Sequence, residues 1–165
     1  MIILLDGSKG AGKTSVSALL VEKINNLSVL SLDVERRALP NKAKSRTELN
    51  REAFEIIIKK AKILLEEGHN IVVDCGLLTE RIKRFDDLSQ EKSAKLYKFF
   101  LKASHDSLLE RVRSRDRASG NDTNVERFEE VYKIVHNKDF SDFTIIDTDK
   151  LSLAEVVRVI IEALG

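Results

Sequence analysis

The sequence predicts an α/β fold built on a five-stranded parallel sheet with helices on both of its faces. Five short apolar runs, rich in β-branched residues, alternate along the chain with longer amphipathic stretches. Strands that are apolar throughout are typical of a parallel sheet covered on both faces, and the alternation is typical of strands connected by helices. The expected strands are residues 1–6, 28–33, 70–74, 95–103 and 143–147.

The composition predicts one soluble, cytoplasmic domain over residues 1–165. Hydrophobic residues make up 42% of the chain and charged residues 33%, with no repeat, low-complexity tract or linker, and this length suffices to bury a core. The single cysteine, Cys75, cannot form an intramolecular disulfide, which suits a reducing compartment. We expect it to pack as a small side chain. No apolar run approaches the roughly 20 residues that span a membrane, so no membrane partner is expected.

Three amphipathic stretches carry the clearest helical signals. Apolar residues repeat on one face over 49–65, 125–135 and 153–164, as in a helix that covers a sheet. The second stretch is preceded by Thr123 with Glu126, and the third by Ser152 with Glu155. This spacing predicts a capping box, in which each side chain bonds the backbone N–H of the other residue.

The most specific motif directly follows the first expected strand. It fits G-x-x-x-x-G-K-[ST], the phosphate-binding P-loop. Glycines let the backbone N–H groups point into one concavity, and the following helix adds its positive N-terminal end. We therefore predict a three-layer P-loop NTPase fold that binds ATP, with Lys13 against the outer phosphates and Thr14 as a ligand of Mg²⁺. The motif consists of Gly7, Ser8, Lys9, Gly10, Ala11, Gly12, Lys13 and Thr14.

The guanine-nucleotide switches are disfavoured among P-loop proteins. Their Asn-Lys-x-Asp motif is approached only at residues 137–140, where Phe140 takes the place of the aspartate. The run from Asp74 to Gly76 is one residue too short for Asp-x-x-Gly. We therefore expect adenine rather than guanine, resting on apolar and backbone contacts that include the loop 148–151.

The stretches after the second and third strands resemble small P-loop kinases, and this resemblance covers nearly the whole chain. Asp33 followed by Arg36 is similar to polynucleotide kinases and zeta-toxin-like kinases. The resemblance implies that Asp33 acts as base toward the acceptor hydroxyl and that Arg36 holds an acceptor phosphate. After the third strand, it implies that Asp74 lies near the metal's water shell or the acceptor, and that Arg81 reaches the acceptor or its phosphate.

A lid is expected over about 111–124. Arg111 and Arg115 lie four residues apart and so on one helix face. This stretch is similar to the approach to the lid in the same kinases. The resemblance implies that both arginines neutralise charge on the transferring phosphoryl group when the lid closes.

Which acceptor is used stays open. The chain also resembles adenylylsulfate kinase over 46–81, but it lacks that family's Asp-Gly-Asp-Asn after the second strand. Nucleoside monophosphate kinases usually carry Asp-Gly-Phe-Pro-Arg where this chain has residues 74–78. The basic stretch 36–46 is a candidate rim that attracts an anionic acceptor, and it permits a nucleic-acid end without requiring one. A nucleotide-dependent binding module without phosphotransfer is the alternative outside the kinases.

Overall fold

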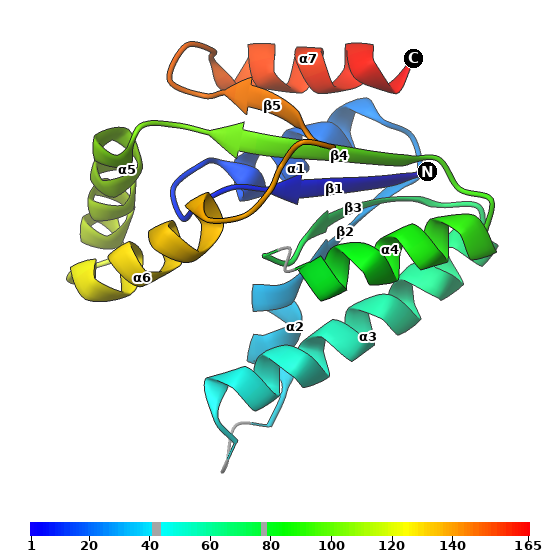
Figure 1. Ribbon diagram of the computed structural model, residues 1–165, viewed down its shortest axis with the longest axis horizontal. Helices are drawn as coiled ribbons and strands as arrows, with labels where there is room; N and C mark the ends of the chain where they lie inside the picture. The colour runs from blue at the N-terminus through cyan, green and yellow to red at the C-terminus, as the bar shows by residue number, and fades with distance from the viewer. Residues whose placement is uncertain (41–43, 77–78) are drawn as a thin grey trace. The chain divides into compact units, whose positions relative to one another are not determined.

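The computed structural model describes residues 1–40, 44–76 and 79–165 (Figure 1). It contains a five-stranded sheet in the order β2-β3-β1-β4-β5, and the strand pairings described are parallel. The predicted α/β, P-loop-type fold is therefore confirmed. The strands are β1 (Ile2–Asp6), β2 (Leu27–Ser31), β3 (Asn70–Asp74), β4 (Leu96–Lys102) and β5 (Thr144–Asp147). The helices are α1 (Lys13–Lys23), α2 (Leu32–Ala38), α3 (Arg46–Glu66), α4 (Thr79–Glu91), α5 (His105–Ala118), α6 (Val125–His136) and α7 (Leu153–Leu164).

The chain forms two compact units. The first comprises residues 1–5 and 17–98, and the second comprises residues 6–16 and 99–165. The boundary of one functional domain at 1–165 stays a prediction. Within the described residues, no helix is both long enough and apolar enough to cross a membrane.

In the first unit, β3 lies between β1 and β2. Ile3 of β1 aligns with Val72, and Leu30 of β2 aligns with Val73. Helices α3 and α4 run alongside each other in this unit (Figure 1), and the rings of Phe54 and Phe85 meet edge to face at 6.1 Å. The core face of α3 contains the buried Leu49, Ala53, Phe54, Ile57, Ile58 and Ala61.

The end of the second strand was predicted wrongly. Strand β2 ends at Ser31, not at residue 33, and helix α2 begins at Leu32. The apolar Leu32 prolongs the hydrophobic run, so the sequence pattern does not reveal where the strand stops. The correction places Asp33 in the first turn of a helix.

In the second unit, β4 pairs with β5. Helices α5 and α6 follow β4 along the chain, and α7 follows β5. Leu101 aligns with Ile146. The predicted capping box of Ser152 and Glu155 is present at the start of α7. The one predicted at Thr123 and Glu126 is wrong, because α6 begins one residue later than that pairing requires: the Asn124 side chain caps it, accepting the Arg127 N–H at 2.8 Å.

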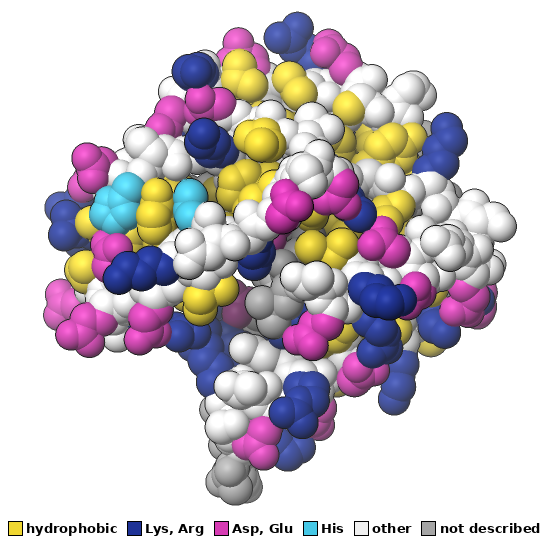
Figure 2. Space-filling model, viewed as in Figure 1, with side chains coloured by type: hydrophobic (Ala, Val, Ile, Leu, Met, Phe, Trp, Pro, Cys, Tyr) yellow, Lys and Arg dark blue, Asp and Glu magenta, His cyan; other side chains and the backbone are white. Residues whose placement is uncertain are grey.

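The surface of the second unit carries an aromatic cluster on α5 and α6. Figure 2 shows two histidine side chains on either side of a hydrophobic one in this region. Tyr132 stacks on His136 with ring centroids 3.8 Å apart, and it meets the His105 ring edge to face at 4.9 Å. These rings fix α6 against the start of α5.

Candidate active site

The P-loop folds as its glycines require. Gly7 and Gly10 have φ angles of 148° and 91°, a region that side chains rarely adopt. A Cβ atom on Gly7 would lie 2.6 Å from the carbonyl oxygen of Leu101, and one on Gly10 would lie 2.7 Å from that of Leu108. The loop is therefore packed so closely against β4 and α5 that only glycine fits at either position.

Lys13 begins α1 and folds back over the loop. Its Nζ donates to the carbonyl oxygens of Gly7, at 2.7 Å, and Ser8, at 3.4 Å. The Ser8 hydroxyl is buried, and no described residue bonds it. Thr14 is exposed in the first turn of α1. A helix N-terminus, an ammonium and an unpaired hydroxyl in one glycine-lined loop fit a phosphate group.

Asp33 and Arg36 bond each other in the first unit, and their expected roles as base and acceptor-binding residue stay predictions. Arg36 Nη2 donates to Asp33 Oδ1 at 2.5 Å. Burial acts to raise the pKa of Asp33, but the hydrogen bond and charge of Arg36, with the charges of Arg37 and Arg46, hold it below its ordinary value. The Nε atom of Arg36 is buried, and no partner for it occurs among the described residues.

The predicted basic rim is partly neutralised by acidic neighbours. Arg36 pairs with Asp33, and Lys44 pairs with Glu52 at 2.5 Å. Lys42 lies outside the described residues. The rim's attraction for an anionic acceptor stays a prediction.

Asp74 is the last residue of β3, and Arg81 lies in the first turn of α4. Asp74 ends the strand and aligns with Ser31 of β2. The Arg81 guanidinium donates from Nη1 to the carbonyl oxygens of Cys75, at 2.5 Å, and Gly76, at 2.9 Å. It also lies 5.1 Å from the centroid of the Phe54 ring. Arg81 thus bonds the backbone that directly follows β3. Its contact with an acceptor stays a prediction, as does the metal role of Asp74. Cys75 is buried, as its expected packing role requires.

The two expected lid arginines point to different partners. Arg111 donates to the hydroxyl and carbonyl oxygens of Thr148, both at 2.9 Å, and to Asp149 at 3.1 Å. It therefore anchors the loop expected to contact adenine. Arg115 instead bonds Asp116, at 2.7 Å from Nη2. Their action on a phosphoryl group stays a prediction.

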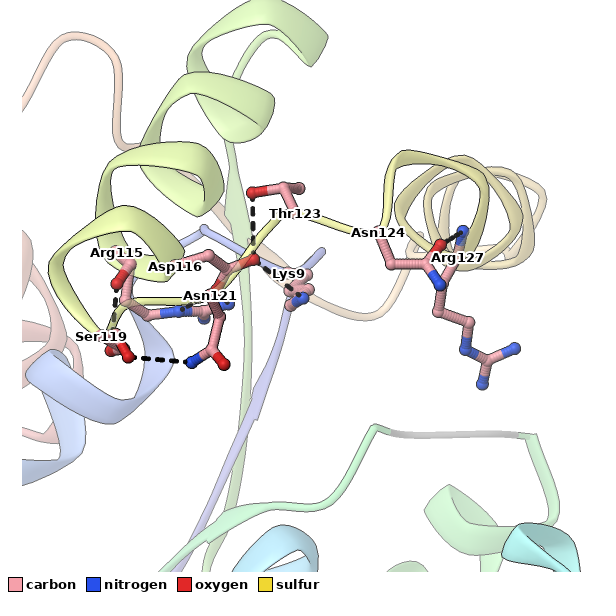
Figure 3. Close-up of polar contacts among 8 residues, drawn as sticks. All are labelled: Lys9, Arg115, Asp116, Ser119, Asn121, Thr123, Asn124 and Arg127. Atoms are coloured by element: carbon pink, nitrogen blue, oxygen red, sulfur yellow. Dashed lines mark hydrogen bonds and ion pairs between the residues drawn. The ribbon is translucent and has the colours of Figure 1, made fainter.

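Asp116 has several contacts within and beyond the predicted lid segment 111–124, and the sequence reasoning missed it (Figure 3). Its carboxylate accepts from Arg115 and from Thr123, the latter at 3.1 Å, and lies 3.8 Å from Nζ of the P-loop residue Lys9. Its carbonyl oxygen accepts the Asn121 N–H at 2.9 Å. The hydrogen bond from Arg115 is the main reason why the pKa of Asp116 lies below its ordinary value. The only sequence signal was an acid within a run of arginines.

No group of three or more His, Cys, Asp or Glu side chains that could enclose a metal occurs among the described residues. The expected Mg²⁺ does not need such a group, because it usually keeps several waters and takes one or two protein ligands.

Known proteins resemble this chain in fold. No curated protein matches this chain in a sequence search, whereas solved structures do match it in fold. The Deinococcus radiodurans tunicamycin resistance protein is 22% identical with a TM-score of 0.71, covering 99% of this chain and 95% of its own. The Mycobacterium tuberculosis APS kinase CysC, in complex with AMPPNP and APS, is 19% identical with a TM-score of 0.72, covering 99% and 96%. A gluconokinase from Sinorhizobium meliloti 1021 is 20% identical with a TM-score of 0.61, covering 94% and 86%.

The sequence also matches a family model. The match extends over residues 2–132, which is well over half of the 165 residues. It includes the whole P-loop, the segment from β2 to α4 and residues 111–124, the predicted lid. The chain belongs to the family described as AAA domain.

Proposed function

We propose that this protein is an ATP- and Mg²⁺-dependent kinase that transfers the γ-phosphoryl group to a hydroxyl of an anionic acceptor. The observation that carries the proposal is the complete P-loop, with Lys13 folded over it and α1 starting at its end. Two proteins of similar fold, an APS kinase holding AMPPNP and APS and a gluconokinase, support it by analogy.

The P-loop residues bind and orient the phosphates. Backbone N–H groups and the positive end of α1 attract the phosphate charge. Lys13 exchanges the carbonyl oxygens of Gly7 and Ser8 for oxygens of the outer phosphates. Thr14 and Asp74 are the residues that would hold Mg²⁺, which supplies further neutralisation of phosphate charge when bound.

Transfer replaces one P–O bond by another. The acceptor oxygen forms a bond to the γ-phosphorus while the bond from that phosphorus to the oxygen shared with ADP breaks. Asp33 orients the acceptor hydroxyl and takes its proton. Arg111 and Arg115 are the lid residues that would neutralise charge on the transferring group, which requires both to leave their present partners.

The acceptor is expected to be anionic because of Arg36. Its Nη2 bonds Asp33, but the N–H of its buried Nε donates to no acceptor among the described residues. A guanidinium presents its donors in a planar fork, which suits an acceptor phosphate or sulfate oxygen. Adenylylsulfate, a nucleoside monophosphate and a polynucleotide end all have such oxygens.

A binding module that holds ATP without transferring phosphate is a second candidate. It is favoured by the same Asp33–Arg36 ion pair, because a carboxylate with a lowered pKa is a weaker base. It would need neither a base nor lid arginines that act on phosphate.

The test is a transfer screen with γ-labelled ATP and Mg²⁺. The acceptors are nucleosides, nucleotides, adenylylsulfate, sugars and 5′-hydroxyl DNA or RNA. The kinase proposal requires label transfer to at least one acceptor, and an anionic one should be preferred over its uncharged counterpart. Tight Mg·ATP binding with no transfer beyond hydrolysis would instead support the binding module.

A further inference from the structure

Asp6, the last residue of β1, is a buried carboxylate directly before the P-loop. Its exposed fraction is 0%. Oδ1 accepts the backbone N–H of Gly7 at 2.8 Å, and Oδ2 lies 3.1 Å from Nζ of Lys138, whose side chain is 14% exposed. A buried carboxylate is costly unless it is paired and hydrogen-bonded, and both conditions are met here.

The segment that carries Lys138 is held in place independently of this ion pair. Lys138 follows the end of α6, and its backbone N–H bonds the carbonyl oxygen of Val135 at 3.3 Å. Two residues later, the ring of Phe140 stacks on Phe100 of β4 with centroids 3.9 Å apart. Phe143 meets the ring of Phe140 edge to face at 5.3 Å. The ammonium is therefore presented to Asp6 by a fixed backbone.

The ion pair lies at one end of a chain of contacts that reaches the P-loop lysine. Lys138 bonds Asp6, and Asp6 accepts the N–H of Gly7. The carbonyl oxygen of Gly7 in turn accepts Nζ of Lys13 at 2.7 Å. Gly7 itself fits closely against β4, so the peptide unit that these groups hold has little room to move.

The net charge at the start of the loop depends on Lys138. A carboxylate beside a phosphate-binding loop has the wrong sign for its ligand, and its repulsion is strong where water is excluded. Paired with an ammonium, the same carboxylate can orient the Gly7 N–H at little electrostatic cost to the phosphates.

We propose that Lys138 and Asp6 are a positioning pair, in which Lys138 neutralises Asp6 so that Asp6 can fix Gly7 without repelling a polyphosphate. The proposal rests on the proposed nucleotide-binding function. The proposal assigns Lys138 a role in ATP affinity. This lysine lies in the segment between α6 and β5, far along the chain from the P-loop.

The experiment is a double-mutant cycle on the full chain, with Mg·ATP, ADP and AMP affinities measured by calorimetry. The variants are Lys138→Met, Asp6→Asn and the two combined, with Lys138→Arg as the conservative replacement. Lys133→Met is the matched control, because it removes an exposed lysine of α6 and changes the net charge equally.

We expect Lys138→Met to weaken Mg·ATP binding about tenfold or more, which corresponds to about 1.4 kcal/mol. The loss should be smaller for ADP and smallest for AMP, because repulsion grows with phosphate charge. The combined variant should recover most of the affinity, and Lys138→Arg and Lys133→Met should resemble the parent. A purely structural role would lower thermal stability without this dependence on phosphate number.

Two results would overturn the pair's role: folded Lys138→Met with parental affinities, or a combined variant no better than Lys138→Met. If Lys138→Met fails to fold, the combined variant still decides, because it removes both charges of the Asp6–Lys138 pair and must then bind ATP nearly as the parent does. Failure of the parent to bind Mg·ATP would instead contradict the proposed function.

Discussion

Arg36 donates to Asp33 across one turn of α2, from Nη2 to Oδ1 at 2.5 Å. The residue expected to act as base is therefore paired with the residue expected to hold the acceptor. Such a pair can serve transfer if the acceptor's anionic group draws Arg36 away, which frees the carboxylate beside the hydroxyl. Acceptor binding and base activation would then be coupled.

The first prediction concerns Asp33→Asn. This substitution keeps the side chain's size and removes its basicity, so transfer should fall about 10²- to 10⁴-fold. Mg·ATP affinity should stay within a few-fold of the parent, because Asp33 is proposed to contact the acceptor hydroxyl and not the nucleotide. Single-turnover transfer and calorimetry on the same preparations measure both.

Asp106→Asn provides the matched control, since it changes an exposed carboxylate in the first turn of another helix. Unchanged transfer in Asp33→Asn would remove Asp33 from the mechanism. A collapse of ATP affinity would show that it acts on the nucleotide instead.

The second prediction concerns the lid. Asp116→Ala removes the acceptor shared by Arg115 and Thr123 and the partner of Lys9. We expect faster amide hydrogen exchange over residues 115–124, with little change in β4 and β5, because local opening needs only these contacts to break. Asp122→Ala, at an exposed position of the same segment, is the control. Equal exchange in the two variants would refute the central role of Asp116.

The third prediction concerns pH. Hydrogen bonds to Asp106 and Glu129 raise the pKa of His105 above its ordinary value of 6.5. A folded-state pKa above the unfolded one means that protonation favours the folded state. The contribution is complete below about pH 6.5 and is lost as the pH rises through the folded-state pKa.

Thermal melts from about pH 6 to 8.5 therefore test this sign. The gap in melting temperature between the parent and His105→Gln should shrink as the pH rises. A gap that stays constant or widens for His105→Gln would contradict the assignment. The comparison uses the trend because the variant also loses the ring contact with Tyr132 at every pH.

Local patterns predicted the parts of this structure that depend on neighbouring residues. The P-loop follows from eight consecutive residues whose glycines and helix start leave little freedom. The capping box at Ser152 follows from a three-residue spacing in the same way. The one at Thr123 failed because Asn124, immediately next to it, is also a strong cap and wins the helix start.

Contacts between residues far apart along the chain could not be predicted from the sequence alone. Arg111 meets Thr148 across 37 residues, and Lys138 meets Asp6 across 132. Helical spacing placed Arg111 and Arg115 on one face correctly, but spacing carries no information about which acidic or carbonyl groups from other elements meet that face. Arg111 and Arg115 were therefore predicted as lid residues without knowledge of their present partners.

The last prediction concerns Lys13 and tests the central claim, that the P-loop supports phosphotransfer. Loss of its ammonium from a charged transition state should cost several kcal/mol, which is about 10²-fold or more in rate. Lys23→Ala, at the exposed end of α1, removes the same charge and should transfer phosphate normally.

The most direct measurement compares transfer of γ-labelled phosphate by the parent, Lys13→Ala and Lys23→Ala, using an acceptor found in the screen. Circular dichroism checks that all three are folded. The account predicts transfer by the parent and Lys23→Ala and almost none by Lys13→Ala. Near-parental transfer by a folded Lys13→Ala would contradict it.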